Sequence, residues 1–392
     1  MIVSLLATLF TLPVVAQIEA GGYQAFKANG KTRGDFPEHI YVVNLFHGFS
    51  WFTNSKDSKP LEGTYHIVIH ADKYYIGSFK KGFLHGDWEF YFHGRLTEKG
   101  SFDGGRPNGK YNYYHDNGQV ESIATYKKRE DHPSLLQHYI AYHENGKLKE
   151  EWHYDENGKR HGVETGYDEK GEICSKQEYV HGKLSGESLK KDKDGYTTLT
   201  GYENGYMVSE TILYPNGNMK SQSFYEPKRP QTRTGKWVEK EENGDLKSEI
   251  EYLKNRKDGE EKLYYKNNKL RSLTEYKKDT RHGKEVVYEE NPHTIRHEGT
   301  FKDGRRHGTY KTYHNGILWK ETVYDEEKVV SEKQFENGKL QLLNLLDETG
   351  SLVNVEKYDN QGKKTYKNTN YKKHPSLKIK EDASGIIDID VE

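Results

Sequence analysis

A short phrase that begins with an aromatic residue and ends in glycine recurs about every 24 residues along this chain, and it limits the folds that the chain can adopt. The phrase is clearest in residues 276–283 (YKKDTRHG) and 301–308 (FKDGRRHG), with weaker copies near Ser134 and Ser209. A fixed period of this size indicates a tandem array in which each repeat is one small supersecondary unit. The closing residue of the phrase, here called the marker glycine, is clear at Gly63, Gly86, Gly109, Gly162, Gly186, Gly235, Gly259, Gly283 and Gly308.

Two aromatic positions accompany the marker glycines. One lies seven or eight residues before the glycine, and its occupants are Phe79, Phe102, Tyr154, Tyr179, Tyr252, Tyr276 and Phe301. The other is a tyrosine five residues after the glycine, found as Tyr91, Tyr114, Tyr167, Tyr264, Tyr288 and Tyr313. We interpret these tyrosines, together with Gly86, Gly109, Gly162, Gly235, Gly259, Gly283 and Gly308, as the structural repeat residues of the array.

A second turn signal follows each marker glycine and is often Asn-Gly. It occurs at residues 117–118, 243–244 and 315–316, and in less regular units at 145–146, 157–158, 216–217 and 337–338. Asn-Gly supplies the positive φ that type I′ hairpin turns require, so each unit is predicted to be strand, turn, strand, turn, with strands of about 5 to 7 residues. Because a lone hairpin is marginal in water, the units must stack. The sequence predicts an all-β, elongated single-layer antiparallel sheet of about twelve tandem hairpins.

Composition agrees with a thin sheet and excludes several compact cores. Of the 392 residues, 32% are hydrophobic and 31% are charged, while tyrosine alone contributes 31. So few aliphatic side chains cannot fill several cores, but one aromatic stripe along a sheet can be buried. The aromatic content of 13% also argues against disorder, since disordered chains are poor in aromatic residues.

Residues 301–310 (FKDGRRHGTY) and 142–148 (YHENGKL) resemble MORN-type repeats, in the variant form found as tandem arrays in bacterial proteins often described as antitoxins of toxin-antitoxin pairs. The resemblance runs from about Leu61 to Leu340. It implies a single-layer antiparallel sheet of consecutive hairpins that serves in binding or scaffolding. Most units lack the Tyr-x-Gly-x-Trp strand of the better known MORN pattern, which weakens any expectation of lipid binding.

The chain divides into five predicted segments. Residues 1–16 are predicted to be a secretory signal peptide, because residues 2–16 are apolar apart from Ser4, Thr8 and Thr11 and end in Val-Val-Ala. We therefore expect export to the periplasm or the cell exterior. Residues 17–60 are predicted to be an N-terminal cap or degenerate repeats, residues 61–340 the repeat array, residues 341–362 a C-terminal cap and residues 363–392 a flexible tail.

No residue pattern in the sequence predicts catalysis, a cofactor or a metal site. The recurrent His85, His161, His282 and His307 lie in different repeats, about 10 Å or more apart, too far for one metal ion. The pair His138 and His143 is interpreted as a chance pairing. The single Cys174 is interpreted as a stray thiol, and the alternating Glu and Lys residues as a solvated face.

Charge and shape limit the partners. The 60 basic and 61 acidic residues give a neutral chain with no long basic block, which disfavours nucleic acid. Exposed tyrosine and tryptophan are common anchors of interfaces. The leading hypothesis is a non-enzymatic binding or scaffolding protein for another protein or an envelope polymer. The alternatives are an antitoxin or immunity protein that sequesters a toxin, and a carbohydrate-binding or hydrolytic surface protein.

Overall fold

The computed structural model describes residues 21–29, 32–45, 49–130, 132–369, 377–381 and 387–391. The predicted signal peptide, residues 1–16, lies outside these ranges. The chain divides into two compact units, residues 1–190 and 191–392. Within the described ranges there is no helix long and apolar enough to cross a membrane.

The described residues of the first unit form fifteen strands. They are β1 (Gly21–Asn29), β2 (Thr32–Leu45), β3 (Phe49–Asn54), β4 (Gly63–His70), β5 (Lys73–Lys80), β6 (Phe83–Phe92), β7 (Arg95–Asp103), β8 (Arg106–Pro107), β9 (Gly109–Tyr114), β10 (Val120–Lys127), β11 (Leu135–Tyr142), β12 (Leu148–His153), β13 (Gly162–Tyr167), β14 (Ile173–Val180) and β15 (Lys183–Lys191).

The second unit continues with strands of the same kind. They are β16 (Thr197–Glu203), β17 (Tyr206–Leu213), β18 (Met219–Glu226), β19 (Arg229–Lys240), β20 (Leu246–Leu253), β21 (Arg256–Tyr264), β22 (Leu270–Lys277), β23 (Thr280–Tyr288), β24 (Ile295–Lys302), β25 (Arg305–Arg306), β26 (Gly308–His314), β27 (Ile317–Asp325), β28 (Lys328–Glu336), β29 (Lys339–Leu346), β30 (Leu352–Tyr358), β31 (Lys364–Thr369), β32 (Leu377–Glu381) and β33 (Ile387–Val391). One 3-10 turn, η2 (Lys266–Asn268), lies between β21 and β22.

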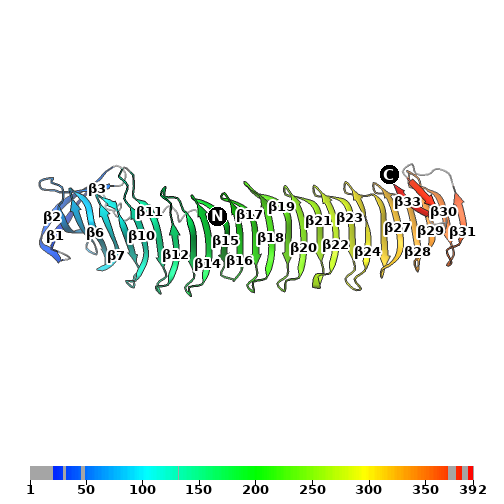
Figure 1. The fold of residues 1–392 in the computed structure, drawn as a ribbon, viewed down its shortest axis with the longest axis horizontal. Coiled ribbons are helices and arrows are strands. Elements are labelled where there is room, and N and C mark those ends of the chain that lie inside the picture. The colour runs from blue at the N-terminus through cyan, green and yellow to red at the C-terminus, as the bar shows by residue number, and fades with distance from the viewer. Residues whose placement is uncertain are drawn as a thin grey trace. The chain divides into compact units, whose positions relative to one another are not determined.

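Within each unit, successive strands pair antiparallel along the sheet (Figure 1). The predicted all-β, single-layer sheet of tandem hairpins is confirmed. Many strands are longer than the predicted 5 to 7 residues, because the residues that flank each marker glycine also pair; β21 and β23, for example, have nine residues each. At the C-terminal end, β31 pairs with β30 beyond the cap boundary predicted at residue 362.

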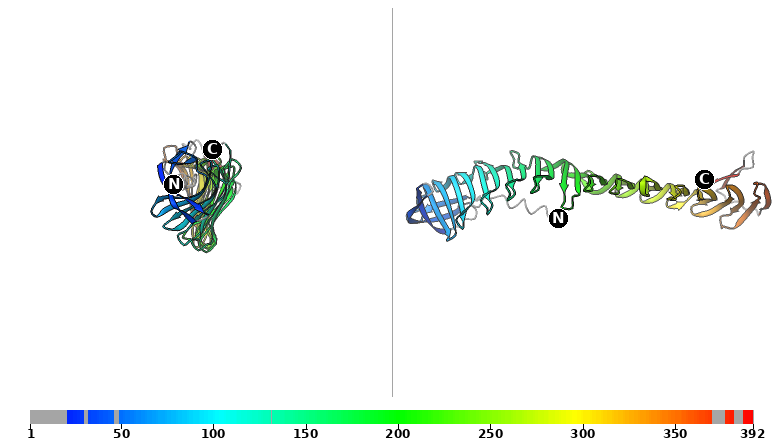
Figure 2. Two further views of the ribbon diagram at one scale, coloured as in Figure 1. Left: turned by 90° about the vertical axis from the view of Figure 1, so that its left-hand side faces the viewer. Right: turned by 90° about the horizontal axis from the view of Figure 1, so that it is seen from below.

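The first strands of the first unit curl over, at the blue end in Figure 2. β1 pairs with both β2 and β4, and β3 pairs with β2. The amide of Phe52 in β3 then donates to the carbonyl of Gly82, in the turn between β5 and β6, at 2.8 Å. This contact encloses Phe52, Ile67, Leu84 and other apolar side chains in the larger of two hydrophobic clusters. Curling covers an edge strand that would otherwise invite pairing with another chain.

Buried hydrophobic side chains are concentrated in two clusters, one in each unit. The first runs from Ala25 to Ala141, and the second gathers Val323, Val330, Leu343, Leu345 and Val353. Among the described residues 142–322, only Val286 and Phe301 are buried hydrophobic residues. Within each unit, the described part of the sheet outside the cluster is therefore thin, as the low aliphatic content predicted.

The Asn-Gly turns are of two kinds, so the type I′ prediction is only partly right. In Asn315-Gly316 and Asn337-Gly338 both residues have positive φ, as a two-residue type I′ turn requires. At residues 117, 145, 157, 216 and 243 only the following glycine does. There the loop is longer. In the turn at Asn117-Gly118, for example, the amide of His115 donates to the carbonyl of Gln119 at 2.8 Å, and the amide of Gly118 donates to the carbonyl of His115 at 2.9 Å. This is the type I turn closed by a glycine bulge.

The marker glycine marks a bulge rather than a hairpin tip. On one side β23 pairs with β22, and there the register shifts between Thr274 and Tyr276 of β22, opposite the segment of β23 that contains Gly283. On its other side β23 pairs with β24, and there Gly283 pairs with Phe301. Its φ of +100° is a conformation that favours glycine. Positive φ also occurs at the other predicted marker glycines, Gly63, Gly86, Gly109, Gly162, Gly186, Gly235, Gly259 and Gly308.

Candidate functional site

The repeats give the sheet two chemically different faces in each unit. We call the face that bears the residue two positions after the marker glycine the aromatic face; its members include Trp88, Tyr111, Glu164, Trp237, Glu261, Glu285 and Tyr310. Because side chains alternate along a strand, the tyrosine five positions after the glycine points to the other side, which we call the opposite face. The two landmarks of the sequence therefore belong to different surfaces.

Glycines in the neighbouring strand make room for large rings on the aromatic face. A Cβ added to Gly77 would lie 2.5 Å from Trp88, one added to Gly100 would lie 2.1 Å from Tyr111, and one added to Gly299 would lie 2.2 Å from Tyr310. Where the strand has no such glycine, the same repeat position is often glutamate, as in Glu164, Glu261 and Glu285. At these six positions, a ring is present where the preceding strand has a glycine, and a glutamate where it does not.

A row of cations links successive repeats on the aromatic face. The residue two positions before the marker glycine is often Arg or Lys, and it stacks on the aromatic residue of the following repeat. The distances from the cation to the ring centroid are 5.4 Å for Arg160 and Tyr179, 4.3 Å for Arg233 and Tyr252, 5.0 Å for Lys257 and Tyr276, 4.1 Å for Arg281 and Phe301, and 4.2 Å for Arg306 and Tyr324. Each contact joins two repeats and leaves most of these rings half-buried.

On the opposite face, several tyrosine hydroxyls donate to glutamates of the same or the preceding strand. Tyr264 donates to Glu249 at 2.6 Å, Tyr313 to Glu298 at 2.7 Å and Tyr91 to Glu89 at 2.9 Å. Burial, and secondarily the hydrogen bond to the carboxylate, raises the pKa of each of these three phenols. These phenols therefore remain protonated donors at neutral pH.

The remaining three landmark tyrosines are also half-buried but make other contacts. The hydroxyl of Tyr114 accepts from the Asn112 amide at 3.5 Å, and the ring of Tyr288 stacks on His293 with centroids 5.0 Å apart. The backbone carbonyl of Tyr167 accepts from Nε2 of His143 at 2.9 Å. That bond places His143 at a turn edge, away from His138.

The recurrent histidines lie between neighbouring repeats. Nδ1 of His85 is 3.2 Å from Asp103, Nδ1 of His282 is 3.4 Å from Asp303 and Nδ1 of His307 is 3.5 Å from Asp325. In each pair the carboxylate belongs to the next turn along the same edge of the sheet. These three histidines thus connect neighbouring repeats.

Two glutamates on the aromatic face of the first unit are buried. Burial raises the pKa of Glu98 to about 7, although the hydroxyl of Tyr111, which donates to it at 2.6 Å, partly opposes the shift. Burial likewise raises the pKa of Glu164 to about 7, against the attraction of Arg160. Both carboxyls are therefore partly protonated near neutral pH.

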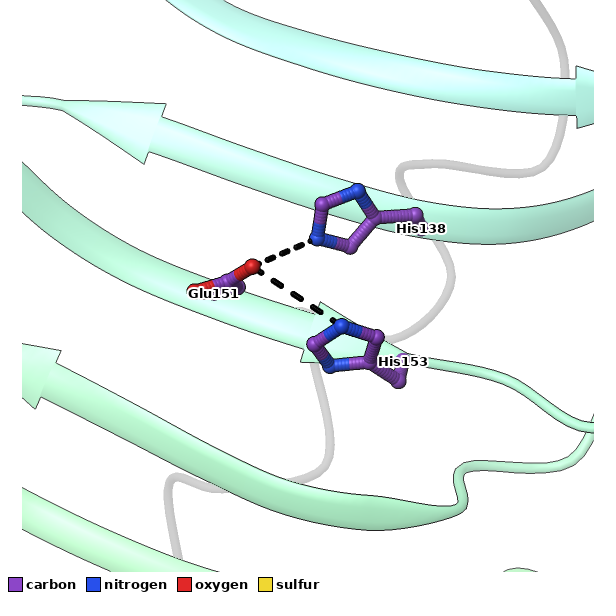
Figure 3. Close-up of side chains that lie close together, drawn as sticks. All are labelled: His138, Glu151 and His153. Carbon is purple, nitrogen blue, oxygen red and sulfur yellow. Dashed lines mark hydrogen bonds and ion pairs between the residues drawn. The ribbon is translucent and has the colours of Figure 1, made fainter.

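The opposite face of the first unit carries a cluster that the sequence analysis did not find (Figure 3). His138 in β11 lies directly across from His153 in β12, and their rings stack with centroids 4.5 Å apart. Oε1 of Glu151, also in β12, is 2.8 Å from Nε2 of His138 and 3.8 Å from Nε2 of His153. His138 thus lies across from His153 and not beside His143, the histidine that is close to it in the sequence.

A second group with potential ligands lies beside the first. Asp155, His161 and His181 each offer one atom within 4.8 Å of the others. Nδ1 of His181 is 2.8 Å from Oδ2 of Asp155, and the rings of His161 and His181 are 5.1 Å apart. The amide of His161 donates to the carbonyl of His153 at 3.0 Å, so the two groups are adjacent.

Comparison with known proteins agrees with the repeat geometry. The sequence profile of the MORN repeat variant matches five segments, residues 107–128, 138–159, 160–181, 233–254 and 257–278. These five segments are repeats of the MORN variant family. Four of the five matched segments contain a marker glycine, and the remaining segment, residues 138–159, contains two Asn-Gly turns. Among proteins of curated function, none matches this chain.

Solved structures similar to this MORN-variant chain come from toxin complexes. A mutant of the Photorhabdus luminescens Tc holotoxin pore is 9% identical over 93% of this chain and 28% of that chain, with a TM-score of 0.16. The TcdB2-TccC3 complex is 9% identical over 93% of this chain and 29% of that chain, with a TM-score of 0.12. This chain thus spans less than a third of either one. TM-scores this low establish neither a shared fold nor a shared function.

Proposed function

We propose that this MORN-variant array is a non-enzymatic binding or scaffolding protein that holds another protein or a cell-envelope polymer against its aromatic face. One observation carries the proposal. Along residues 142–322 the thin sheet keeps most of its rings half-buried rather than enclosed, including Trp152, Tyr252 and Tyr276. Half-buried tyrosine and tryptophan beside arginine are the side chains that most often dominate binding at protein interfaces.

The cations of the aromatic face support the same proposal. Arg233 and Arg281 lie over rings, so their guanidinium groups are held in place before a partner arrives. A pre-ordered side chain loses less conformational entropy on binding. A row of such groups at the spacing of the repeats suits an extended partner better than a compact small molecule.

Export is part of the proposal. It rests on the apolar residues 2–16 and the small residues before Gln17, which are typical of a secretory signal. Because an exported protein meets the components of the cell envelope, its partner is expected there. Fractionation of cells that produce the full chain tests this part: the cleaved protein is expected outside the cytoplasm, and a full-length cytoplasmic product would contradict it.

Site-specific photo-crosslinking tests which face binds. A photoreactive phenylalanine analogue replaces Tyr276 on the aromatic face or, as the matched control, Lys262 on the opposite face of the adjacent strand. Each variant is irradiated in the producing cells, and the adducts are identified by mass spectrometry. We expect a discrete adduct from position 276 and little from position 262.

The other outcomes separate the alternatives. Adducts of equal yield from both positions would contradict the choice of face. A lack of protein adducts together with retention on an array of envelope glycans would favour the polymer as the partner. If neither adducts nor glycan binding occur, the binding function itself is wrong. An adduct with one small toxin, whose activity the purified chain suppresses, would identify an antitoxin or immunity protein.

A further inference from the structure

The cluster of His138, Glu151 and His153 is a set of metal-ligating atoms already gathered in one place (Figure 3). One ring nitrogen of His138, one of His153 and a carboxylate oxygen of Glu151 all lie within 4.8 Å of one another. We propose that these three side chains bind a divalent transition metal ion of the zinc class.

The distances suit such an ion after a small adjustment. Zinc binds imidazole nitrogen and carboxylate oxygen at about 2.0 to 2.2 Å, so tetrahedral neighbours stand roughly 3.4 Å apart. The two contacts of Glu151 Oε1, 2.8 Å to His138 and 3.8 Å to His153, lie on either side of that separation. Side-chain movements of less than about 1 Å would bring all three ligands to bonding distance.

The donor set selects the class of metal. Two imidazoles and one carboxylate favour zinc, cobalt, nickel or copper over calcium and magnesium, which prefer oxygen ligands. The side chains of His138, Glu151 and His153 are 30%, 36% and 51% exposed, so the ion can reach them from solvent. Three protein ligands leave a fourth position for water or for a group of a partner.

The backbone holds the ligands in place without the ion. His138 and His153 are direct cross-strand partners in β11 and β12, and behind them Tyr139 packs on Trp152 with ring centroids 4.9 Å apart. A single hydrogen bond between His138 and Glu151 accounts for the shorter contact. It does not account for His153, whose Nε2 also faces Oε1 of Glu151.

The adjacent group of Asp155, His161 and His181 is less suited and serves as the control. Nδ1 of His161 accepts from the backbone amide of His181, so its lone pair is engaged. Oδ1 of Asp155 accepts from the amides of Asn157 and Lys159, which fixes the carboxylate in a turn. Metal binding through Nδ1 of His161 or Oδ1 of Asp155 would break these contacts.

Calorimetric titration of the full chain with Zn²⁺ tests the proposal. The protein carries no polyhistidine tag and is first freed of metal with a chelator. We expect one equivalent to bind, with affinity reduced at least roughly tenfold in His138→Ala, in His153→Ala and in Glu151→Gln, and unchanged in the control His161→Ala. Substitution with Co²⁺ is expected to give the visible absorption of a low-coordinate site in the wild type and in the control only.

Three results would overturn the proposal. The first is the absence of Zn²⁺ binding to the wild type. The second is equal binding by the wild type and the three cluster variants. The third is loss of binding in His161→Ala but not in His153→Ala, which would move the site to the second group. Because circular dichroism of each variant reports its fold, and Glu151→Gln preserves the size of the side chain, a folding defect is separable from lost ligation.

Discussion

The guanidinium of Arg306 lies 4.2 Å from the ring centroid of Tyr324, and its Nη1 donates to the hydroxyl of that tyrosine at 2.7 Å. Arg306 belongs to one repeat and Tyr324 to the next. The same cation also pairs with Glu327 at 2.8 Å. One side chain therefore holds two repeats together through a stacking contact, a hydrogen bond and an ion pair, and related cations recur at this repeat position.

Replacing Arg306 by alanine is expected to lower the free energy of unfolding by about 1 to 2 kcal/mol, because the stacking and charged contacts are lost together. Urea denaturation of the full chain measures the loss. Arg305→Ala is the matched control, since the neighbouring side chain is 63% exposed and meets Glu326 only at 3.5 Å; its effect is expected to stay within about 0.5 kcal/mol. Equal losses in the two variants would contradict this account of the cation row.

Gly299→Ala is expected to destabilise the protein by about 1 to 3 kcal/mol, because the new methyl group would lie 2.2 Å from the ring of Tyr310. Because the expected destabilisation is steric, it should disappear when the ring of Tyr310 is removed. In a double-mutant cycle, the same substitution in a Tyr310→Ala background should cost clearly less. A cost that does not depend on residue 310 would show that the glycine is needed for another reason.

The sequence predicted the repeat, the thin sheet and the landmark residues because each depends on a local period. The marker glycines such as Gly283 and the tyrosines such as Tyr264 keep a fixed spacing, so one repeat explains the others. The type of turn was harder to predict. Asn145-Gly146 and Asn315-Gly316 are the same dipeptide, yet one has a longer loop and the other a two-residue turn. Loop length, not the dipeptide, decides between them.

The cluster on the opposite face was not predictable from spacing alone. His138 and Glu151 are thirteen positions apart, and they meet only because β11 pairs with β12 in a register that sets His138 across from His153. A one-residue slip would move one histidine to the aromatic face. The closure of β3 onto the β5–β6 turn depends in the same way on contacts between distant segments.

The turn edge opposite the marker glycines is also held together across repeats. Nδ2 of Asn145 donates to the carbonyl of Glu169 in the next repeat at 2.9 Å, and its Oδ1 accepts from the amide of Lys147 at 3.0 Å. Asn145→Ala is expected to cost about 1 to 2 kcal/mol and to speed amide hydrogen exchange at Lys147.

The matched control for Asn145 is Asn157→Ala, at the equivalent turn position. There the carboxylate of Asp155 accepts from the amides of residues 157 and 159, so the turn keeps its contacts when the asparagine side chain is removed. We expect a loss of about 0.5 kcal/mol or less. If Asn145→Ala is as mild as this control, side-chain bonds between turns do not stabilise the array.

Glu98 is expected to make the stability of the first unit depend on pH. The residue is 7% exposed, and burial raises the pKa of its carboxyl from 4.5 to about 7. Between these two values the folded state binds more protons than the unfolded state, so the free energy of unfolding falls as the pH rises through this window and levels off above it. The full difference amounts to about 3 kcal/mol at most.

Glu98→Gln isolates this contribution, because the amide cannot ionise but still accepts from the hydroxyl of Tyr111. Near pH 5 the wild-type carboxyl is mostly neutral when folded, so the variant and the wild type should unfold at similar urea concentrations. Near pH 8 the variant should be more stable, since it does not carry a buried negative charge. Glu121→Gln, at a carboxylate on an exposed position of β10, should leave the pH dependence unchanged. If the wild type were instead the more stable protein at pH 8, the Glu98 carboxylate would be stabilised in the fold and its pKa lowered rather than raised.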